Sequence, residues 1–287
     1  MSKPNFPEIP SYEVQELLAQ GANTCIFRAK HELSKRAAAV KVLLPRAAAV
    51  PVNVVRLQHE AKALSRCSHK GVVVVYDYGI SPNQFPYLVM DYLPGSTLAR
   101  VLKEKQTLEL DDFNRLFAEV CEAAGHMHKS GIIHRDLKPA NLMTMPAEAA
   151  ALVKIIDFGT AKMLNEDLPT TMSPDLEGEI RGTPAYMSPE QCMGQELDER
   201  SDIFSLGSTM FEALTGRSPF LGADSRETMQ NIVNREAPPL ARLKPEAADL
   251  APVVWRCLLK SADDRFQSMP EVAAALSKVA QMIKARG

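Results

Sequence analysis

The chain has 287 residues, of which 46% are hydrophobic and 24% charged, and 33 Lys and Arg nearly balance 35 Asp and Glu. This length allows two lobes with a substantial core, and the composition is ordinary for a soluble globular protein. A net charge of −2 gives no general argument for nucleic acid or for an acidic membrane surface as a partner.

No run approaches the roughly 18–20 apolar residues of a membrane span. Residues 1–10 include three prolines and no apolar core of a signal peptide, so they are read as a Pro-rich tail of low structure. The five cysteines are scattered, without a C-x-x-C pair. This pattern favours reduced thiols and a cytoplasmic location over a disulfide framework or a zinc site.

After the tail, the sequence predicts β-strands in residues 12–20, 24–29 and 37–44, with a turn at Gly21. Further strands are predicted at 72–79 and 86–92, and a helix at 52–67 after Pro51. One face of this helix has Leu57, Glu60, Ala61 and Leu64. A carboxylate on an apolar face needs a cationic partner. Lys41 in the third predicted strand is the natural candidate.

From Gly95 onward the sequence is mostly helical. Asp111 or Asp112 is expected to cap a helix, and three helical stretches have apolar residues at 3.6-residue spacing. The core-facing positions are Phe113, Leu116, Phe117, Val120, Ala124 and Met127, then Ile203, Leu206, Met210, Phe211 and Leu214, and finally Val272, Leu276, Val279 and Ile283.

Residues 132–159 contain two short motifs, H-R-D-L-K-P-A-N at 134–141 and D-F-G at 157–159. Asp136 can accept a proton from an attacking hydroxyl. Asn141 and Asp157 offer the oxygen ligands that Mg²⁺ prefers. The alternative interpretation, a polar turn and a strand end, does not explain why both motifs occur in this order.

The two motifs resemble the catalytic loop and the metal-binding motif of eukaryotic-type Ser/Thr protein kinases, most like the bacterial members of that family. Further matches are A-A-V-K at 38–41, G-T-P-A-Y-M-S-P-E at 182–190 and D-R-F at 264–266. The resemblance implies an α+β kinase domain over residues 11–285. Its β-rich N-lobe, with one main helix, would cover about 11–92, and its helical C-lobe about 93–285.

The resemblance implies transfer of the γ-phosphate of ATP to protein Ser/Thr hydroxyls, with Mg²⁺. Asp136 would orient the hydroxyl and take its proton, and Lys138 would neutralise charge at the transferred phosphate. Lys41, paired with Glu60, would hold the α- and β-phosphates. Asn141 and Asp157 would be the magnesium ligands.

The resemblance also implies an ATP site, with Met90 as gatekeeper and backbone contacts to adenine from the hinge. Its residues are Leu18, Gly21, Ile26, Ala39, Lys41, Met90, Asp91, Leu93 and Met143. The Gly-rich loop of the family has three glycines, but the stretch Leu18–Ile26 keeps only Gly21. A Cβ at the other positions limits backbone approach, so looser nucleotide binding is expected.

Two alternatives follow. A pseudokinase or scaffold module with weak nucleotide binding is favoured only by the altered Gly-rich loop. A small-molecule kinase of the choline or aminoglycoside type shares an H-x-D…N pattern but lacks the segment that here reads G-T-P-A-Y-M-S-P-E.

Regulation is also implied. In the family, the arginine at the position of Arg135 binds a phosphate on the activation segment. Thr170 or Thr171 is a hypothetical autophosphorylation site, against the alternative of an unmodified loop. Thr183 would reach Asp136 and Lys138.

Three residues would have structural roles: Glu190 pairs with Arg265, Asp202 holds the backbone of the catalytic loop, and His134 packs against Phe158. The alternative for His134 is a general base. The expected partners are protein substrates, and a homodimer for trans-autophosphorylation is compatible with the resemblance. No nucleic acid and no membrane segment is expected.

Overall fold

The computed structural model describes residues 7–163 and 184–286, which divide into two compact units. The first unit comprises residues through Ser68, Val72–Pro94 and Asp157–Gly159. The second comprises His69–Gly71, Gly95–Ile156 and the residues from Thr160 onward. The predicted lobes were consecutive in sequence, whereas these units are interleaved.

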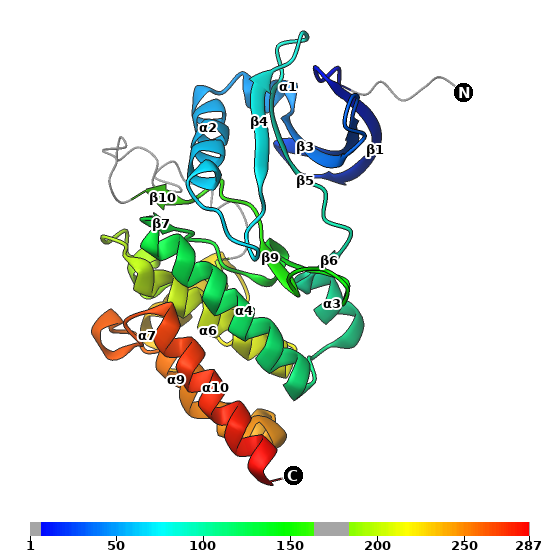
Figure 1. The fold of residues 1–287 in the computed structure, drawn as a ribbon. Helices are drawn as coiled ribbons and strands as arrows, with labels where there is room; N and C mark the ends of the chain where they lie inside the picture. Colours follow the sequence, from blue (N-terminus) through cyan, green and yellow to red (C-terminus); the bar gives the residue numbers. More distant parts are fainter. Residues whose placement is uncertain (1–6, 164–183, 287) are drawn as a thin grey trace. The chain divides into compact units, whose positions relative to one another are not determined.

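The first unit is built on an antiparallel five-stranded sheet in the order β1-β2-β3-β5-β4 (Figure 1). All five predicted strands are present. Val72 and Val73 are buried but precede the last strand of the sheet instead of belonging to it. The bounds are β1 (Tyr12–Gln20), β2 (Thr24–His31), β3 (Ala37–Leu43), β4 (Val75–Ile80) and β5 (Pro86–Asp91).

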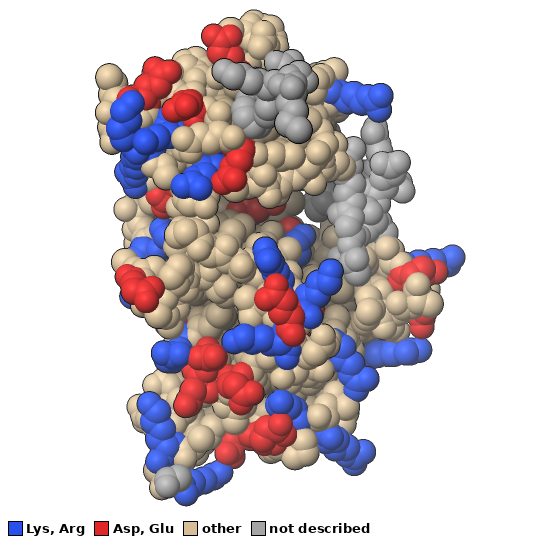
Figure 2. Space-filling view, turned by 90° about the vertical axis from the view of Figure 1, so that its right-hand side faces the viewer, with Lys and Arg blue, Asp and Glu red and all other residues tan. Residues whose placement is uncertain are grey.

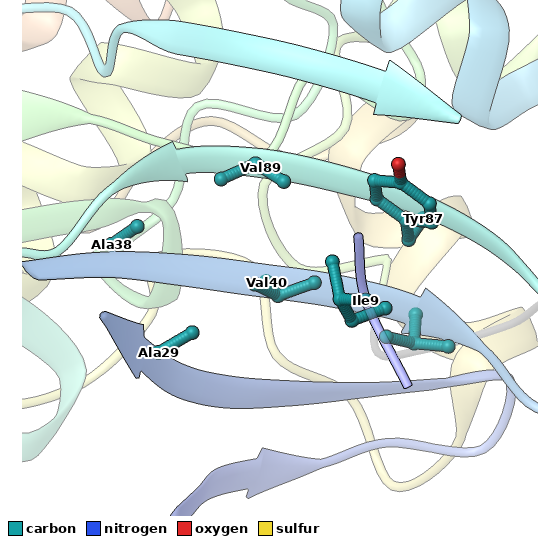
Figure 3. Close-up of a cluster of buried hydrophobic side chains, with 7 residues drawn as sticks. Ile9, Ala29, Ala38, Val40, Tyr87 and Val89 are labelled. Atoms are coloured by element: carbon teal, nitrogen blue, oxygen red, sulfur yellow. The ribbon is translucent and has the colours of Figure 1, made fainter. Parts of the chain in front are cut away.

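The two faces of this sheet present different side chains, because successive residues of a strand point to opposite faces. One face forms the buried cluster in Figure 3, made of Ile9, Ala29, Ala38, Val40, Val42, Tyr87 and Val89. Ile9 is only 3% exposed, so the described end of the expected tail packs on the sheet. The other face has Ile26 opposite Lys41 and Ala39 opposite Met90.

The helices of the first unit are α1 (Pro45–Ala48) and α2 (Pro51–Ser65), and each has a proline in its first turn, where no N–H is needed. The buried positions of α2 are Asn53, Leu57, Glu60, Ala63 and Leu64. Ala61, predicted on this face, is only half-buried. Asn53 Nδ2 donates to Ala47 O at 3.0 Å and so ties α2 to α1.

The second unit is mainly helical, and α10 packs along α4 (Figure 1). Its helices are α3 (Leu98–Lys105), α4 (Leu110–Lys129), α5 (Pro189–Cys192), α6 (Glu199–Thr215), α7 (Ser225–Asn234), α8 (Leu240–Leu243), α9 (Ala251–Cys257) and α10 (Met269–Arg286). Short strands surround the catalytic motif: β6 (Ser96–Thr97), β7 (Ile132–Ile133), β8 (Leu142–Thr144), β9 (Val153–Ile155) and β10 (Lys162–Met163). Within the described residues, 3₁₀ turns occur at Pro139–Asn141, Pro245–Leu250 and Ala262–Asp264.

The apolar face predicted for α4 is confirmed, since all six of its residues are buried. The predicted cap is wrong. Glu109 is at the N-cap without a side-chain hydrogen bond, and Asp111 and Asp112 lie in the first turn. Their negative charges in the first turn interact favourably with the positive end of the helix dipole, but their side chains do not cap the helix. Of the residues predicted to face the core in α10, Ile283 is only half-buried.

The five cysteines are all free thiols. Within residues 7–163 and 184–286, no helix is long and apolar enough to cross a membrane. On the face drawn in Figure 2, the described Lys and Arg side chains are interspersed with Asp and Glu.

Candidate active site

Three predicted site residues of the second unit meet at one carboxylate. Lys138 Nζ lies 2.7 Å from Asp136 Oδ2, and Asn141 Nδ2 donates to the same oxygen at 3.0 Å. Asn141 Nδ2 also donates to the backbone oxygen of Asp136 at 2.8 Å. The Asp136 side chain is 30% exposed, so a proton acceptor is held in a fixed orientation within reach of solvent.

The backbone before Asp136 is held by a buried carboxylate of α6. Asp202 Oδ2 accepts the N–H of His134 and Oδ1 accepts the N–H of Arg135, each at 2.8 Å. His128 Nε2 lies 2.8 Å from Asp202 Oδ2. Burial would raise the pKa of Asp202, but the hydrogen bond and charge of His128 lower it overall. Asp202 therefore holds the catalytic loop as the sequence indicated.

Both ring nitrogens of His134 are engaged. Nδ1 accepts the N–H of Asp136 at 3.3 Å, and Nε2 lies 3.2 Å from Ile156 O. The side chain is fully buried. These bonds favour the structural role over a catalytic base. The predicted neighbour, Phe158, belongs to the first unit.

The first unit contains a cluster of three charges. Lys41 Nζ donates to Glu60 at 2.9 Å (Oε1) and 2.8 Å (Oε2), and to Asp157 Oδ1 at 2.9 Å. Burial opposes the charge of Lys41, but Asp157 and Glu60 raise its pKa overall. The pairing expected from Glu60 on the apolar face of α2 is present, and Asp157 is an additional partner.

This charge cluster fits a further cation. One ammonium and two carboxylates sum to a charge of −1, and the Asp157 side chain is 48% exposed. In the second unit, Asn141 directs its amide nitrogen to Asp136, which makes its amide oxygen the candidate ligand atom. Carboxylate and amide oxygens suit Mg²⁺.

The predicted nucleotide contacts divide between the units. Ile26, Ala39 and Met90 share a sheet face with Lys41 in the first unit, whereas Met143 is in β8 of the second. Ala39 and Met90 are buried, and Leu18 is exposed.

Some backbone groups of the proposed hinge and of the Gly-rich loop are already hydrogen-bonded within the protein. Asp91 N donates to Val74 O at 2.9 Å, so a backbone contact from Asp91 to adenine would have to use its carbonyl oxygen. Its side chain bonds Tyr76 and Arg36, and Leu93 is half-buried. In the altered Gly-rich loop, Gly21 N donates to Thr24 O at 2.8 Å.

The Glu190–Arg265 pair predicted from the sequence is present and bidentate. Arg265 Nη1 and Nη2 each donate to a Glu190 oxygen at 2.8 Å, and Arg265 is fully buried. Burial would raise the pKa of Glu190, but Arg265 lowers it overall. The other activation-segment residues, Thr170, Thr171 and Thr183, lie outside the described residues.

Arg135 combines two unusual features. Its φ of 68° is in the left-handed region, which is disfavoured for residues with a Cβ. Among the described residues, its buried Nε has no hydrogen-bond partner. Burial lowers the pKa of this guanidinium. An anion beside it would offset that cost.

Sequence reasoning missed three supporting residues: His128, Gln191 and Thr209. Thr209 Oγ1 donates to Leu137 O at 3.1 Å, and Gln191 Nε2 donates to Arg135 O at 2.8 Å. Thr209 lies two helical turns after Asp202 on α6, so helical spacing could have indicated it. The bond from Gln191 to Arg135 and the contact of His128 with Asp202 have no local sequence signal.

Comparison with known proteins gives one consistent result. The model of the protein kinase domain family matches residues 12–274. Serine/threonine-protein kinase PknB of Mycobacterium leprae is 34% identical over 273 residues, covering 93% of this chain and 43% of that protein. Serine/threonine-protein kinase pkn3 of Myxococcus xanthus is 32% identical over 275 residues, covering 95% and 50%. The chain thus spans half or less of the length of these relatives.

A solved structure is also similar. The kinase domain of PknI from Mycobacterium tuberculosis superposes with a TM-score of 0.72 at 25% identity, covering 94% of this chain and 96% of that one.

Proposed function

This chain belongs to the protein kinase domain family, and from that premise we propose that it transfers the γ-phosphate of ATP to Ser and Thr hydroxyls of proteins. The observation that supports this most directly is the convergence of Lys138 and Asn141 on the carboxylate of Asp136. Phosphoryl transfer through a loose transition state depends mainly on such positioning and on charge.

Asp136 orients the attacking hydroxyl and accepts its proton late in the step. The ammonium of Lys138, 2.7 Å away, stabilises charge that develops on the transferred phosphate. A fixed positive charge has more effect here than in bulk water: at 4 Å two unit charges interact by roughly 4 kcal/mol at an effective dielectric of 20, against about 1 kcal/mol in water.

Lys41 binds the α- and β-phosphates, and Glu60 and Asp157 fix its position. Asp157 of the first unit and Asn141 of the second would each offer an oxygen ligand to Mg²⁺, and the metal would supply positive charge to neutralise the phosphate oxygens. Ile26 and Ala39 on the sheet face of Lys41 would contact the adenine from the first unit, and Met143 of β8 is the proposed adenine contact of the second unit. The carbonyl of Asp91 and the N–H of Leu93 bond its edge.

The Asp136→Asn variant tests the chemistry. Asparagine keeps the shape but removes the proton acceptor, so we expect transfer of ³²P from [γ-³²P]ATP to a generic basic protein to fall at least ~100-fold. The thermal shift induced by Mg-ATP should persist. Retention of most activity would mean that the role of Asp136 is wrongly assigned.

The same assay separates the alternatives. A pseudokinase would show an ATP-dependent thermal shift without transfer by the parent protein. Phosphorylation of sugars or aminoglycosides, but not of protein, would indicate a small-molecule kinase.

We further propose that Arg135 binds a phosphate on the activation segment, placed there by autophosphorylation of Thr170 or Thr171. The buried Nε of Arg135, which has no hydrogen-bond partner among the described residues, supports this proposal. Mass spectrometry after incubation with Mg-ATP tests it. Absence of phosphate between residues 163 and 181 would contradict it.

A further inference from the structure

The helix α5 begins with a capping box formed by Ser188 and Gln191. Ser188 Oγ accepts the N–H of Gln191 at 3.3 Å, and Gln191 Oε1 accepts the N–H of Ser188 at 2.9 Å. Glutamate and glutamine serve equally well at this position of a capping box. The cap therefore explains the amide oxygen of Gln191 but not its NH₂ group.

The NH₂ group reaches the catalytic loop. Gln191 Nε2 donates to the backbone oxygen of Arg135 at 2.8 Å, across 56 positions of sequence. This bond requires a donor, and an ionised carboxylate has none. The side-chain amide of Gln191 thus contacts two segments of the second unit: its oxygen caps α5, and its NH₂ group binds the loop at Arg135.

The contacted carbonyl belongs to the peptide that leads into Asp136. Gln191 holds the oxygen of this peptide, and His134 Nδ1 accepts its N–H at 3.3 Å. The preceding peptide is held by Asp202, which accepts the N–H of Arg135 at 2.8 Å. Both peptides flanking a residue with φ of 68° are therefore fixed.

A left-handed conformation at a non-glycine residue costs roughly 1–2 kcal/mol and persists only where the surroundings enforce it. The plane of the Arg135–Asp136 peptide sets the direction of the Asp136 Cα–Cβ bond. Displacing a reacting group by about 1 Å can reduce a rate ~100-fold. The bond from Gln191 thus acts on a strained peptide adjacent to the proton acceptor.

We propose that Gln191 is a positioning residue for phosphoryl transfer: its amide NH₂ fixes the Arg135–Asp136 peptide and so the orientation of the Asp136 carboxylate. This inference rests on the proposed role of Asp136.

Gln191→Glu is the sharpest test, because it retains the capping acceptor and replaces the NH₂ donor with a carboxylate oxygen that is ionised at pH 8. At pH 8 we expect kcat to fall about tenfold, with the KM for ATP within about twofold of the parent, as a misoriented proton acceptor predicts.

The pH profile supplies a second readout. The new carboxyl has a reference pKa of about 4.3, which partial burial beside a carbonyl oxygen would raise. Its protonated form can donate to Arg135 O, so the activity relative to the parent should increase from pH 8.5 to 5.5. Gln191→Met lacks both functions, and its relative activity should stay low across this range.

Asp224→Ala is the matched control. Asp224 caps α7 of the same unit by accepting the N–H of Glu227 at 2.7 Å, so this variant loses a helix cap without touching the catalytic loop. Its kcat should equal that of the parent. Parent-like kcat for either Gln191 variant, equal losses in the control, or identical pH profiles for the Glu and Met variants would overturn the inference.

Asp136→Asn, measured in the same assay, separates the two levels. An active Asp136→Asn protein would refute the assigned role of Asp136 whatever Gln191 does. An inactive Asp136→Asn protein with fully active Gln191 variants would refute only the positioning role.

Discussion

Two buried cations, Lys41 in the first unit and Arg265 in the second, are paired with carboxylates in different ways. Arg265 is fully buried and donates to both Glu190 oxygens and to the carbonyls of Arg200, Leu259 and Lys260. Lys41 has two carboxylate partners, one of them 48% exposed. The Arg265 pair is neutral and saturated by protein groups, whereas the side chains of Lys41, Glu60 and Asp157 together sum to a charge of −1 and include one that is about half exposed.

The difference teaches that burial and ion pairing alone do not mark a functional site. A closed, neutral pair satisfies its own donors and serves the fold. A cluster of unequal positive and negative side chains with a partly exposed member is suited to a charged ligand. Substitutions in the first cluster should therefore act on catalysis, and substitutions in the second should act on stability.

Lys41→Met should have the largest effect. Loss of the phosphate-binding ammonium is expected to lower transfer about 1,000-fold, equivalent to roughly 4 kcal/mol of transition-state stabilisation. Steady-state transfer from [γ-³²P]ATP measures this. Lys260→Met is the matched control, because Lys260 Nζ donates to Ile232 O and, among the residues that the structure describes, to no carboxylate. Comparable losses in both variants would remove the distinction between the clusters.

Arg265→Met should lower stability and leave activity nearly unchanged. Removing one partner of a buried pair leaves an uncompensated carboxylate and costs about 3–5 kcal/mol of unfolding free energy. Urea unfolding followed by circular dichroism measures the cost. Activity per folded molecule should stay near that of the parent, and a cost under ~1 kcal/mol would contradict the structural role.

Glu60→Gln should give an intermediate result. The amide can still accept one hydrogen bond from Lys41, and Asp157 remains its ionic partner. The charge of the cluster changes from −1 to 0, so we expect kcat/KM for Mg-ATP to fall about 10- to 100-fold with an unfolding free energy within about 1 kcal/mol of the parent. An unchanged kcat/KM would show that the net charge of the cluster does not contribute to the reaction with Mg-ATP.

The smallest expected effect is on the pH dependence of stability. Because Arg265 lowers the pKa of Glu190 in the folded state, the unfolded chain binds the proton more readily. The stabilisation is then fully present above the unfolded pKa of about 4.3 and is lost as pH falls through the folded pKa. As the pH is lowered from 6 to 3, the unfolding free energy of Arg265→Met should decrease less than that of the parent. Parallel curves would contradict the assigned cause.

The sequence indicated those features that depend on local periodicity or on a necessary partner. The buried face of α4 follows from its 3.6-residue spacing, and Glu60 on an apolar face required a cation such as Lys41. The cap of α4 could not be decided, because two adjacent aspartates compete with Glu109 and backbone geometry selects among them. The bond from Gln191 to Arg135 joins residues far apart in sequence and through a backbone oxygen, which no side-chain pattern encodes.

The assignment of Asp157–Gly159 to the first unit limits how the chain can be dissected. A fragment ending at Pro94 contains Lys41 and Glu60 but not Asp157. Such a fragment has a neutral pair where the intact chain has three charges. A chimaera that exchanges only N-terminal segments between two relatives likewise joins the lysine of one parent to the aspartate of the other.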